Sequence, residues 1–235
     1  MPHTLSIPLG NRLLDALPSK DREQLLAHCE TFELVIAETL YRAGEPIPHV
    51  YFPTGGFISL VTPTDGSDNL EMGMVGSEGM LGITLILGVD VAPFHALVQG
   101  AGPALRIETA AFLRELKQSP ALQRELQRYL YVSMSQLAQT AACNRFHVVE
   151  ARLARWLLMT QDRAHSDTFH VTHIFMAFML GVRRVGITKA ANSLQRQNLI
   201  RYHRGNITVL DRAGLETASC GCYRAGRETY ARILG

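Results

Sequence analysis

Hydrophobic and polar residues change their periodicity twice along the chain. After a short helical segment that begins near Ser19, residues 32–107 show brief β-type runs that are broken by glycine, proline and aspartate. The stretch Asp65-Gly66-Ser67-Asp68 has the composition of a hairpin tip between two of these runs. Many short strands joined by such turns are typical of an antiparallel β-barrel or jelly roll.

A helical period follows from Glu108. One helix is expected over residues 108–118, and Pro120, which suits a first helical turn, opens a long helix over about residues 120–145. Along this helix, apolar or small residues alternate by four and three positions, as in a coiled coil. They are Leu126, Leu130, Ser133, Leu137, Thr140 and Asn144. The spacing slightly favours a dimerisation helix, but a core helix of a single chain has the same stripe, so both interpretations stay open.

The final third alternates helices with two β-like runs. Helices are expected over residues 147–164 and 172–180, and a third opens at Arg183-Arg184 after a turn at Gly181. The runs LIRYH and NITVL then flank a turn at Arg204-Gly205-Asn206. This order is that of a winged helix-turn-helix.

These patterns predict an α+β protein with three parts. Residues 1–118 are expected to form a β-barrel or jelly-roll domain with flanking helices, residues 119–146 the long dimerisation helix, and residues 147–235 the winged helix-turn-helix domain. Asp211 is suited to cap a last helix that runs through about Cys220.

Composition narrows the class of protein. Of the 235 residues, 47% are hydrophobic and 19% are charged, which is typical of a globular protein. The longest apolar runs have nine residues and are too short to span a bilayer, and the N-terminus lacks the pattern of a signal peptide. We therefore expect a soluble, cytoplasmic protein that does not bind membranes.

Charge is distributed unevenly. Residues 1–145 carry 10 basic and 15 acidic side chains, a net charge of −5, whereas residues 146–235 carry 13 and 6, a net charge of +7. No acidic residue lies between Thr168 and Leu210. A segment of one sign of charge favours a polyanionic partner, and double-stranded DNA is the first candidate.

The helix that opens at the two arginines is expected to read DNA. Its outer face presents the candidate base-reading residues Arg183, Arg184, Thr188, Lys189 and Asn192. The N-terminal residues of such a helix enter the major groove, where arginine is the preferred reader of guanine. Candidate phosphate contacts are Thr172, Arg201, His203 and Arg204.

The segment LGVRRVGITKAANSLQRQNLIRYHRGNITVLDRAGLE resembles the C-terminal domain of the Crp/Fnr family of bacterial transcription regulators. The stretch VEARLARWLL, the long helix and the glycine-punctuated β-runs are similar to the rest of that family. The resemblance implies a homodimer that reads a pseudo-palindromic site, contacts RNA polymerase and carries a sensor in its barrel. The family's characteristic recognition-helix arginine falls on Arg184 and a later basic residue on Lys189, whereas Val185 stands where a glutamate is common.

The sensor differs more from the family pattern. In nucleotide-binding members of the family a Gly-Glu pair binds ribose, and an Arg-Ser or Arg-Thr pair some ten residues later binds the cyclic phosphate. Gly82 is retained here, but Ile83 replaces the glutamate, and Pro93-Phe94 replaces the arginine pair beside His95. The polar pair of the long helix that touches the purine matches Leu137-Ala138. Because a buried phosphate needs a cationic partner, we expect the usual cyclic-AMP pocket to be lost.

Other interpretations rank lower. The first alternative is a regulator that responds to a cyclic mono- or dinucleotide through a rearranged pocket, and a remote one is a jelly-roll enzyme with an added helical domain. No catalytic constellation supports an enzyme. The four cysteines are Cys29, Cys143, Cys220 and Cys222, and reduced structural thiols are favoured over metal ligands because no second CxxC or HxxxH pair accompanies Cys220-Gly221-Cys222. No metal or cofactor is predicted, and an unknown small-molecule effector is left open.

Overall fold

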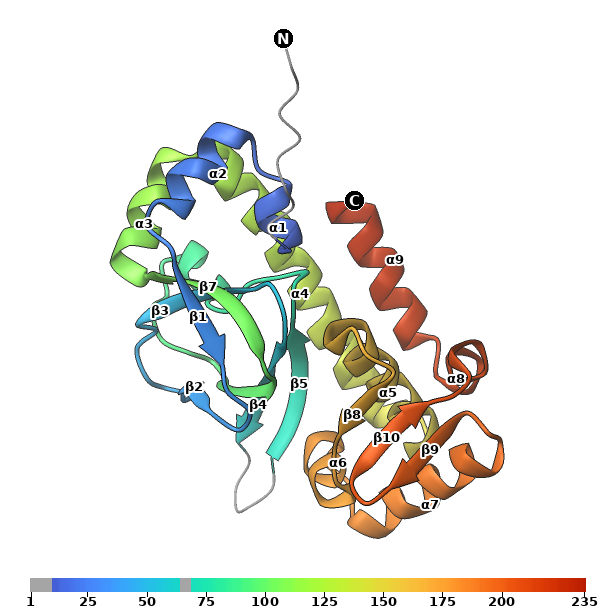
Figure 1. The fold of residues 1–235 in the computed structure, drawn as a ribbon. Helices are drawn as coiled ribbons and strands as arrows, with labels where there is room; N and C mark the ends of the chain where they lie inside the picture. Colours follow the sequence, from blue (N-terminus) through green and yellow to red (C-terminus); the bar gives the residue numbers. More distant parts are fainter. Residues whose placement is uncertain (1–9, 64–68) are drawn as a thin grey trace.

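Figure 1 shows the computed structural model, which describes residues 10–63 and 69–235. Its N-terminal half is an antiparallel β-domain (residues 30–108) whose strands form two sheets, with the orders β1-β7-β3 and β2-β6-β4-β5. The strands are β1 Glu30–Leu34, β2 Thr39–Tyr41, β3 His49–Pro53, β4 Phe57–Pro63, β5 Asn69–Val75, β6 His95–Gly100 and β7 Gly102–Glu108. Both sheets contribute to one apolar core, as in a jelly roll, and each sheet is open at its edges. The tip expected at residues 65–68 lies outside the described residues, but Pro63 pairs with Asn69 beside it.

Short helices cover one end of the β-domain, and a long helix leaves it (Figure 1). The short helices are α1 Arg12–Asp15, α2 Ser19–Leu26, the 3-10 helix η1 Ile83–Leu87 and α3 Thr109–Gln118, and the long helix is α4 Pro120–Phe146. The start of α4 follows from its sequence, because the Ser119 hydroxyl accepts a hydrogen bond from the Leu122 amide at 3.0 Å and Pro120 occupies the first turn. The predicted long helix is therefore present.

The C-terminal part has the predicted winged helix-turn-helix order. Its elements are α5 Val149–Ala164, β8 Thr168–His170, α6 His173–Leu180, α7 Arg184–Arg196, β9 Ile200–His203, β10 Asn206–Val209, α8 Arg212–Ala218 and α9 Cys222–Leu234. The three strands form one antiparallel sheet in the order β8-β10-β9. Together with the β-domain, this order confirms the α+β fold.

The last helix is an exception. The sequence predicts a final helix through about Cys220, but the chain continues into α9, which lies alongside α4 and returns toward the β-domain (Figure 1). There the Tyr230 hydroxyl donates a hydrogen bond to the Glu78 carbonyl oxygen at 2.8 Å. The segment of residues 147–235 thus contains a helix that packs on the rest of the chain as well as on the winged domain.

Two neighbouring faces of α4 differ in their exposure. Of the predicted stripe, Leu126 and Thr140 are buried within the single chain, and Leu130, Ser133, Leu137 and Asn144 are partly buried. The face that α4 leaves exposed carries Gln127, Tyr131, Met134, Ala138, Ala141 and Arg145. Its spacing of four and three is the same, displaced by one position. Because both faces have the same spacing, the sequence pattern alone does not decide which of them would meet a partner.

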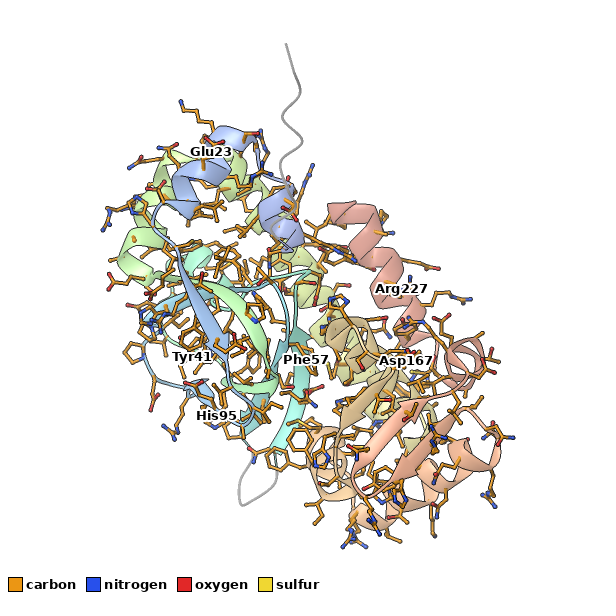
Figure 2. The ribbon with its side chains drawn as sticks, in the orientation of Figure 1. Glu23, Tyr41, Phe57, His95, Asp167 and Arg227 are labelled. Atoms are coloured by element: carbon orange, nitrogen blue, oxygen red, sulfur yellow. The ribbon has the colours of Figure 1, made fainter. Side chains whose placement is uncertain are left out.

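The β-domain and the C-terminal part share a hydrophobic core. Phe57, Val61 and Met74 from β4 and β5 are buried together with Trp156 of α5 and Met176 of α6. Figure 2 shows Phe57 on the side of the β-domain that faces these helices. In the described residues, no helix is both long enough and apolar enough to cross a membrane.

Candidate DNA-binding surface

The supporting helix α6 begins and ends with recognisable signals. The Thr172 hydroxyl accepts a hydrogen bond from the Phe175 amide at 3.2 Å and so caps the helix. The helix ends at Gly181, whose φ of +60° is a left-handed conformation that favours glycine. A β-carbon there would approach the Leu70 side chain of β5 to 2.9 Å. The turn between α6 and α7 therefore packs directly against the β-domain.

Helix α7 presents the cations that the sequence predicted. Ile187, Ala190, Ala191 and Leu194 are buried and fix its inner face. The exposed residues are Arg183, which is the N-cap, and Arg184, Val185, Lys189, Asn192 and Arg196. Arg196 was not among the predicted base readers. Its position, seven residues after Lys189 and four after Asn192, places it on the same face, so the helical period was the signal for it.

Thr188 has a different surrounding from the other predicted base readers. Its hydroxyl donates a hydrogen bond to the Arg184 carbonyl oxygen at 3.1 Å and lies 3.1 Å from Nδ1 of His173. Because the one hydroxyl proton is used, the imidazole donates from Nδ1 to Thr188. The His173 ring stacks on Tyr202 of β9 with 4.2 Å between the ring centroids. Burial, with a smaller effect from the Arg184 charge, lowers the pKa of His173, so the neutral imidazole joins α6, α7 and the wing.

The wing ends in a tight turn between β9 and β10. Arg204 and Gly205 have φ angles of +48° and +83°, as a two-residue hairpin turn of this twist requires. A β-carbon at Gly205 would approach the His170 ring to 2.7 Å, so this position also needs glycine for space. Arg201, His203 and Arg204 are all exposed here. The three predicted wing contacts thus lie together at one edge.

These cations have no internal counter-charge. Within the described chain, none of Arg183, Arg184, Lys189, Arg196, Arg201 and Arg204 takes part in an ion pair. Arg183 and Arg184 lie at the N-terminus of α7. The amide groups of a helix N-terminus and the helix dipole attract anions. The surface combines exposed guanidinium groups, a helix N-terminus and a basic wing, which is a combination that suits a phosphate backbone.

The predicted sensor residues lie in an apolar surrounding. Gly82 is buried with a φ of +101°, and a β-carbon on it would lie 3.3 Å from Val50, so the backbone is tightly packed there. Ile83 and Phe94 are partly buried, and Pro93 is exposed. His95 accepts a hydrogen bond on Nδ1 from the Ala43 amide at 3.0 Å.

The two predicted residues of the long helix, Leu137 and Ala138, are not directed to one pocket, since the first is partly buried and the second is exposed. The cations of the β-domain also lie away from its interior. Arg42 and Arg106 are its only Lys or Arg residues, Arg42 is exposed, and Arg106 pairs with Glu30 at 2.5 Å. The β-domain therefore has no buried cation that would meet a phosphate.

Comparisons with known proteins agree with this geometry. A family model for a Crp-like helix-turn-helix domain matches residues 151–218. No protein of curated function matches the chain in a sequence search. Among solved structures, FixK2 from Bradyrhizobium japonicum is 13% identical, with 82% of this chain and 98% of that one covered and a TM-score of 0.69. Residues 151–218 thus form a Crp-like helix-turn-helix domain, within a chain that has the fold of Crp/Fnr-type structures.

Two further structures support the Crp/Fnr fold over about four fifths of the chain. A Crp/Fnr-family transcriptional regulator from Thermus thermophilus is 20% identical, with 81% of this chain and 98% of that one covered and a TM-score of 0.67. The c-di-GMP-responsive global regulator CLP from Xanthomonas campestris is 18% identical, with 82% and 99% covered and the same TM-score. The resemblance inferred from the sequence is confirmed: this chain has the Crp/Fnr regulator fold and a Crp-like helix-turn-helix domain.

Proposed function

We propose that this Crp/Fnr-type chain is a homodimeric transcription regulator, not an enzyme, which binds pseudo-palindromic DNA in the cytoplasm. The exposed cationic face of α7 is the observation that carries the proposal. Its arginines lie at the helix N-terminus without an internal carboxylate, where a duplex would supply the counter-charge.

Roles within this surface follow from exposure and hydrogen bonding. Arg184, Lys189 and Asn192 are free to reach base edges, with Arg183 at the start of the helix. Thr188 contributes mainly by orienting His173, because its hydroxyl is already engaged. On the wing, Arg201, His203 and Arg204 contact phosphates, as does the cap region at Thr172. Val185 is exposed on the reading face and has no acceptor for a cytosine amino group, so cytosine at that position is not favoured.

Dimerisation would use the exposed stripe of α4. Tyr131 and Met134 are 54% and 60% exposed, which is high for such side chains on a long helix, and Ala138 and Ala141 continue the stripe. A spacing of four and three residues suits packing against the same helix of a second copy. The pairing would bring two copies of α7 to about 34 Å apart, one turn of DNA.

The apolar β-domain suits an effector without a buried phosphate, or no effector. A signal there has a short path to the DNA-binding helices, since β4 and β5 share a core with α5 and α6 and Leu70 touches the turn before α7. The bound dimer would then present a surface to RNA polymerase.

Two arginine variants test the DNA-binding surface. The preferred site is first selected from random duplexes with the parent protein, and affinity is then measured by fluorescence anisotropy against salt concentration. Arg184→Ala is expected to weaken binding to that site by about 1–3 kcal/mol per half-site and to broaden the preference at one base pair. Arg204→Gly keeps the left-handed turn and removes only the charge, so it should weaken all sequences alike and reduce the salt slope by about 1.

Arg42→Ala serves as the matched control, because Arg42 is an exposed arginine of the β-domain. It should leave both affinity and salt slope unchanged. If Arg184→Ala bound selected and random duplexes as the parent does, α7 would not be the reading helix.

Met134→Glu tests the dimer. A carboxylate at this exposed position would meet its own copy across the helix pair, so we expect monomers in sedimentation at micromolar concentration and loss of cooperative binding to the full site. Gln127→Glu, at the end of the same stripe, should have the smaller effect. A Met134→Glu protein that remains dimeric would show that α4 pairs through another face or not at all.

A further inference from the structure

Three cysteines and one histidine converge where the long helix ends. Cys143 lies in the last turn of α4, and His147 is the residue that caps the C-terminus of this helix. Cys220 lies between α8 and α9 and Cys222 is the first residue of α9, both more than 70 residues later in the chain. The four donor atoms, three Sγ and one imidazole nitrogen, all lie within 4.8 Å of one another. We propose that this cluster is a binding site for a zinc ion.

The distances match a tetrahedral site. With bonds of about 2.3 Å to sulfur and about 2.0 Å to nitrogen, a tetrahedral zinc ion holds two sulfurs about 3.8 Å apart, and a sulfur and a nitrogen about 3.5 Å apart. Here Sγ of Cys143 and Sγ of Cys220 are 3.5 Å apart, and Sγ of Cys222 lies 3.4 Å from Nδ1 of His147. The donors therefore need shifts of less than about 1 Å to close around the ion. A set of three thiolates and one imidazole selects zinc over magnesium or calcium.

Groups around the cluster support the metal. The Gln139 side-chain amide donates a hydrogen bond to Sγ of Cys222 at 3.0 Å, and such outer donors stabilise zinc thiolates. Three thiolates and one zinc ion carry a net charge of −1. Arg155 interacts favourably with the charge of the Cys143 thiolate, and Arg152 with the charges of Cys143 and Cys220, so positive charge is available beside the site.

A metal site explains the cluster better than apolar packing of the three thiols does. The three buried thiols form a group of their own, separate from both large cores, with only Ala151 packed against them. Thiols that serve as small apolar groups have no need of an imidazole or an amide donor in contact with them. His147 is exposed, so one side of the cluster is open to the entry of an ion. The site left little sign in the sequence because its two halves are far apart and neither is a CxxC pair.

The position of the cluster defines what zinc would do. His147 and Val148 link α4 to α5, where the DNA-binding domain starts. A bound ion would tie this link and the end of α4 to the start of α9. Zinc would thus stabilise one arrangement of the link, in the way that a ligand stabilises the state that binds it. The metal site rests on these residues alone and does not depend on DNA binding.

Metal binding is measured directly on the full chain. The reduced protein is stripped with a chelator and titrated with Co²⁺ and then Zn²⁺. We expect one Co²⁺ per chain, with the absorption bands of tetrahedral cobalt and of thiolate-to-cobalt charge transfer, which zinc then abolishes. X-ray absorption of the zinc form should give three sulfur ligands at about 2.3 Å and one nitrogen at about 2.0 Å. Zinc should also raise the unfolding temperature.

Variants assign the ligands. Cys143→Ser and Cys222→Ser each remove one of the three thiolates, so both should lower metal affinity and weaken the charge-transfer band, and His147→Cys should retain a tetrahedral spectrum with a fourth thiolate. Gln139→Ala should weaken zinc affinity by about 10- to 100-fold while the spectrum stays the same. Cys29→Ser is the matched control, because Cys29 is the fourth cysteine and lies outside the cluster. It should bind zinc as the parent does, and circular dichroism before titration verifies that each variant is folded.

Three outcomes would overturn the proposal. The first is a folded, reduced protein that binds less than stoichiometric metal at micromolar concentration. The second is equal loss of metal in Cys29→Ser and Cys143→Ser. The third is a protein that, purified without reductant, contains a Cys143–Cys220 disulfide and that, when reduced, takes up no metal, which would make the cluster a thiol pair of redox chemistry.

Discussion

Glu71 and Glu78 both extend from the β-domain to α5, but Glu78 contacts a cation there and Glu71 contacts neutral groups. Glu78, in the loop after β5, accepts a hydrogen bond from Nε of Arg163 at 2.9 Å, and Nη2 of the same guanidinium forms an ion pair with it at 2.6 Å. Glu71, on β5, accepts a hydrogen bond from Trp156 Nε1 at 3.0 Å and has no cation in contact. One contact is an ion pair and the other is a buried carboxyl with neutral partners.

The difference determines which contact responds to pH. Burial raises the pKa of Glu71 to about 7, and the hydrogen bonds from Ser59 and Trp156 counteract only part of this rise. The Ser59 hydroxyl lies 2.7 Å from Glu71 and 2.5 Å from the Gln99 oxygen, and one proton cannot serve both acceptors. A protonated Glu71 donates to Ser59, which then donates to Gln99. At Arg163, burial would lower the pKa of the guanidinium, but the Glu78 carboxylate more than compensates, so this pair stays charged.

Breaking the ion pair should have the largest effect. Arg163→Met keeps much of the side-chain volume but leaves the Glu78 carboxylate partly buried without a cation. We expect the free energy of unfolding to fall by about 3 kcal/mol, at the low end for a buried pair because Glu78 retains some solvent. Urea unfolding at pH 8 measures it.

The double variant Glu78→Gln/Arg163→Met is the control. When the Glu78 carboxylate is absent, Arg163→Met should cost little stability. The double-mutant cycle of parent, two single variants and double variant should therefore give a coupling free energy above about 1 kcal/mol. Additive losses would mean that Arg163 stabilises the chain only through its packing and its bond to the Met159 carbonyl.

Removing the charge of Glu71 should raise the free energy of unfolding, by about as much as Arg163→Met lowers it, and only at high pH. Below about 4.5 the carboxyl is protonated in both the folded and the unfolded chain, so it contributes no pH dependence. Between about 4.5 and 7 the unfolded chain releases the proton and the folded one keeps it, so stability falls as pH rises, by about 3 kcal/mol in all. Glu71→Gln retains both hydrogen bonds without ionising, and should exceed the parent by up to this amount at pH 8.

The difference between parent and Glu71→Gln, followed from pH 4 to 8, isolates this group from the other titrating residues. It should be near zero at the acid end and grow toward pH 7. Glu33→Gln, which removes an exposed carboxylate of β1, is the matched control. A constant difference across the range would place the Glu71 pKa in the folded chain near its ordinary value.

Local patterns predicted what local interactions determine. Pro120, Gly181 and the Arg204-Gly205 turn are each fixed by backbone requirements within a few residues, and so the helix start, the helix-turn-helix and the wing were predictable. The exposed cations of α7 followed from the same helical period. The free face of α4, helix α9 and the state of Glu71 depend on which segments pack against them. Contacts between residues as far apart as Glu71 and Trp156 leave no periodic trace in the sequence.

Trp156→Phe sharpens the comparison with the smallest change. It removes only the Nε1 donor and the outer part of the ring, so the cost to stability should be about 1–2 kcal/mol near pH 5. Because the lost hydrogen bond favours the ionised carboxyl, the pKa of Glu71 should rise further, and stability should continue to fall at pH values above 7 where the parent levels off. The same substitution in Glu71→Gln should cost stability without any dependence on pH. The cost of Trp156→Phe is therefore compared, as a function of pH, between the parent and the Glu71→Gln background. If this cost had the same pH profile in both, Trp156 would stabilise the interface through apolar contact alone, and the indole would have no part in setting the charge of Glu71.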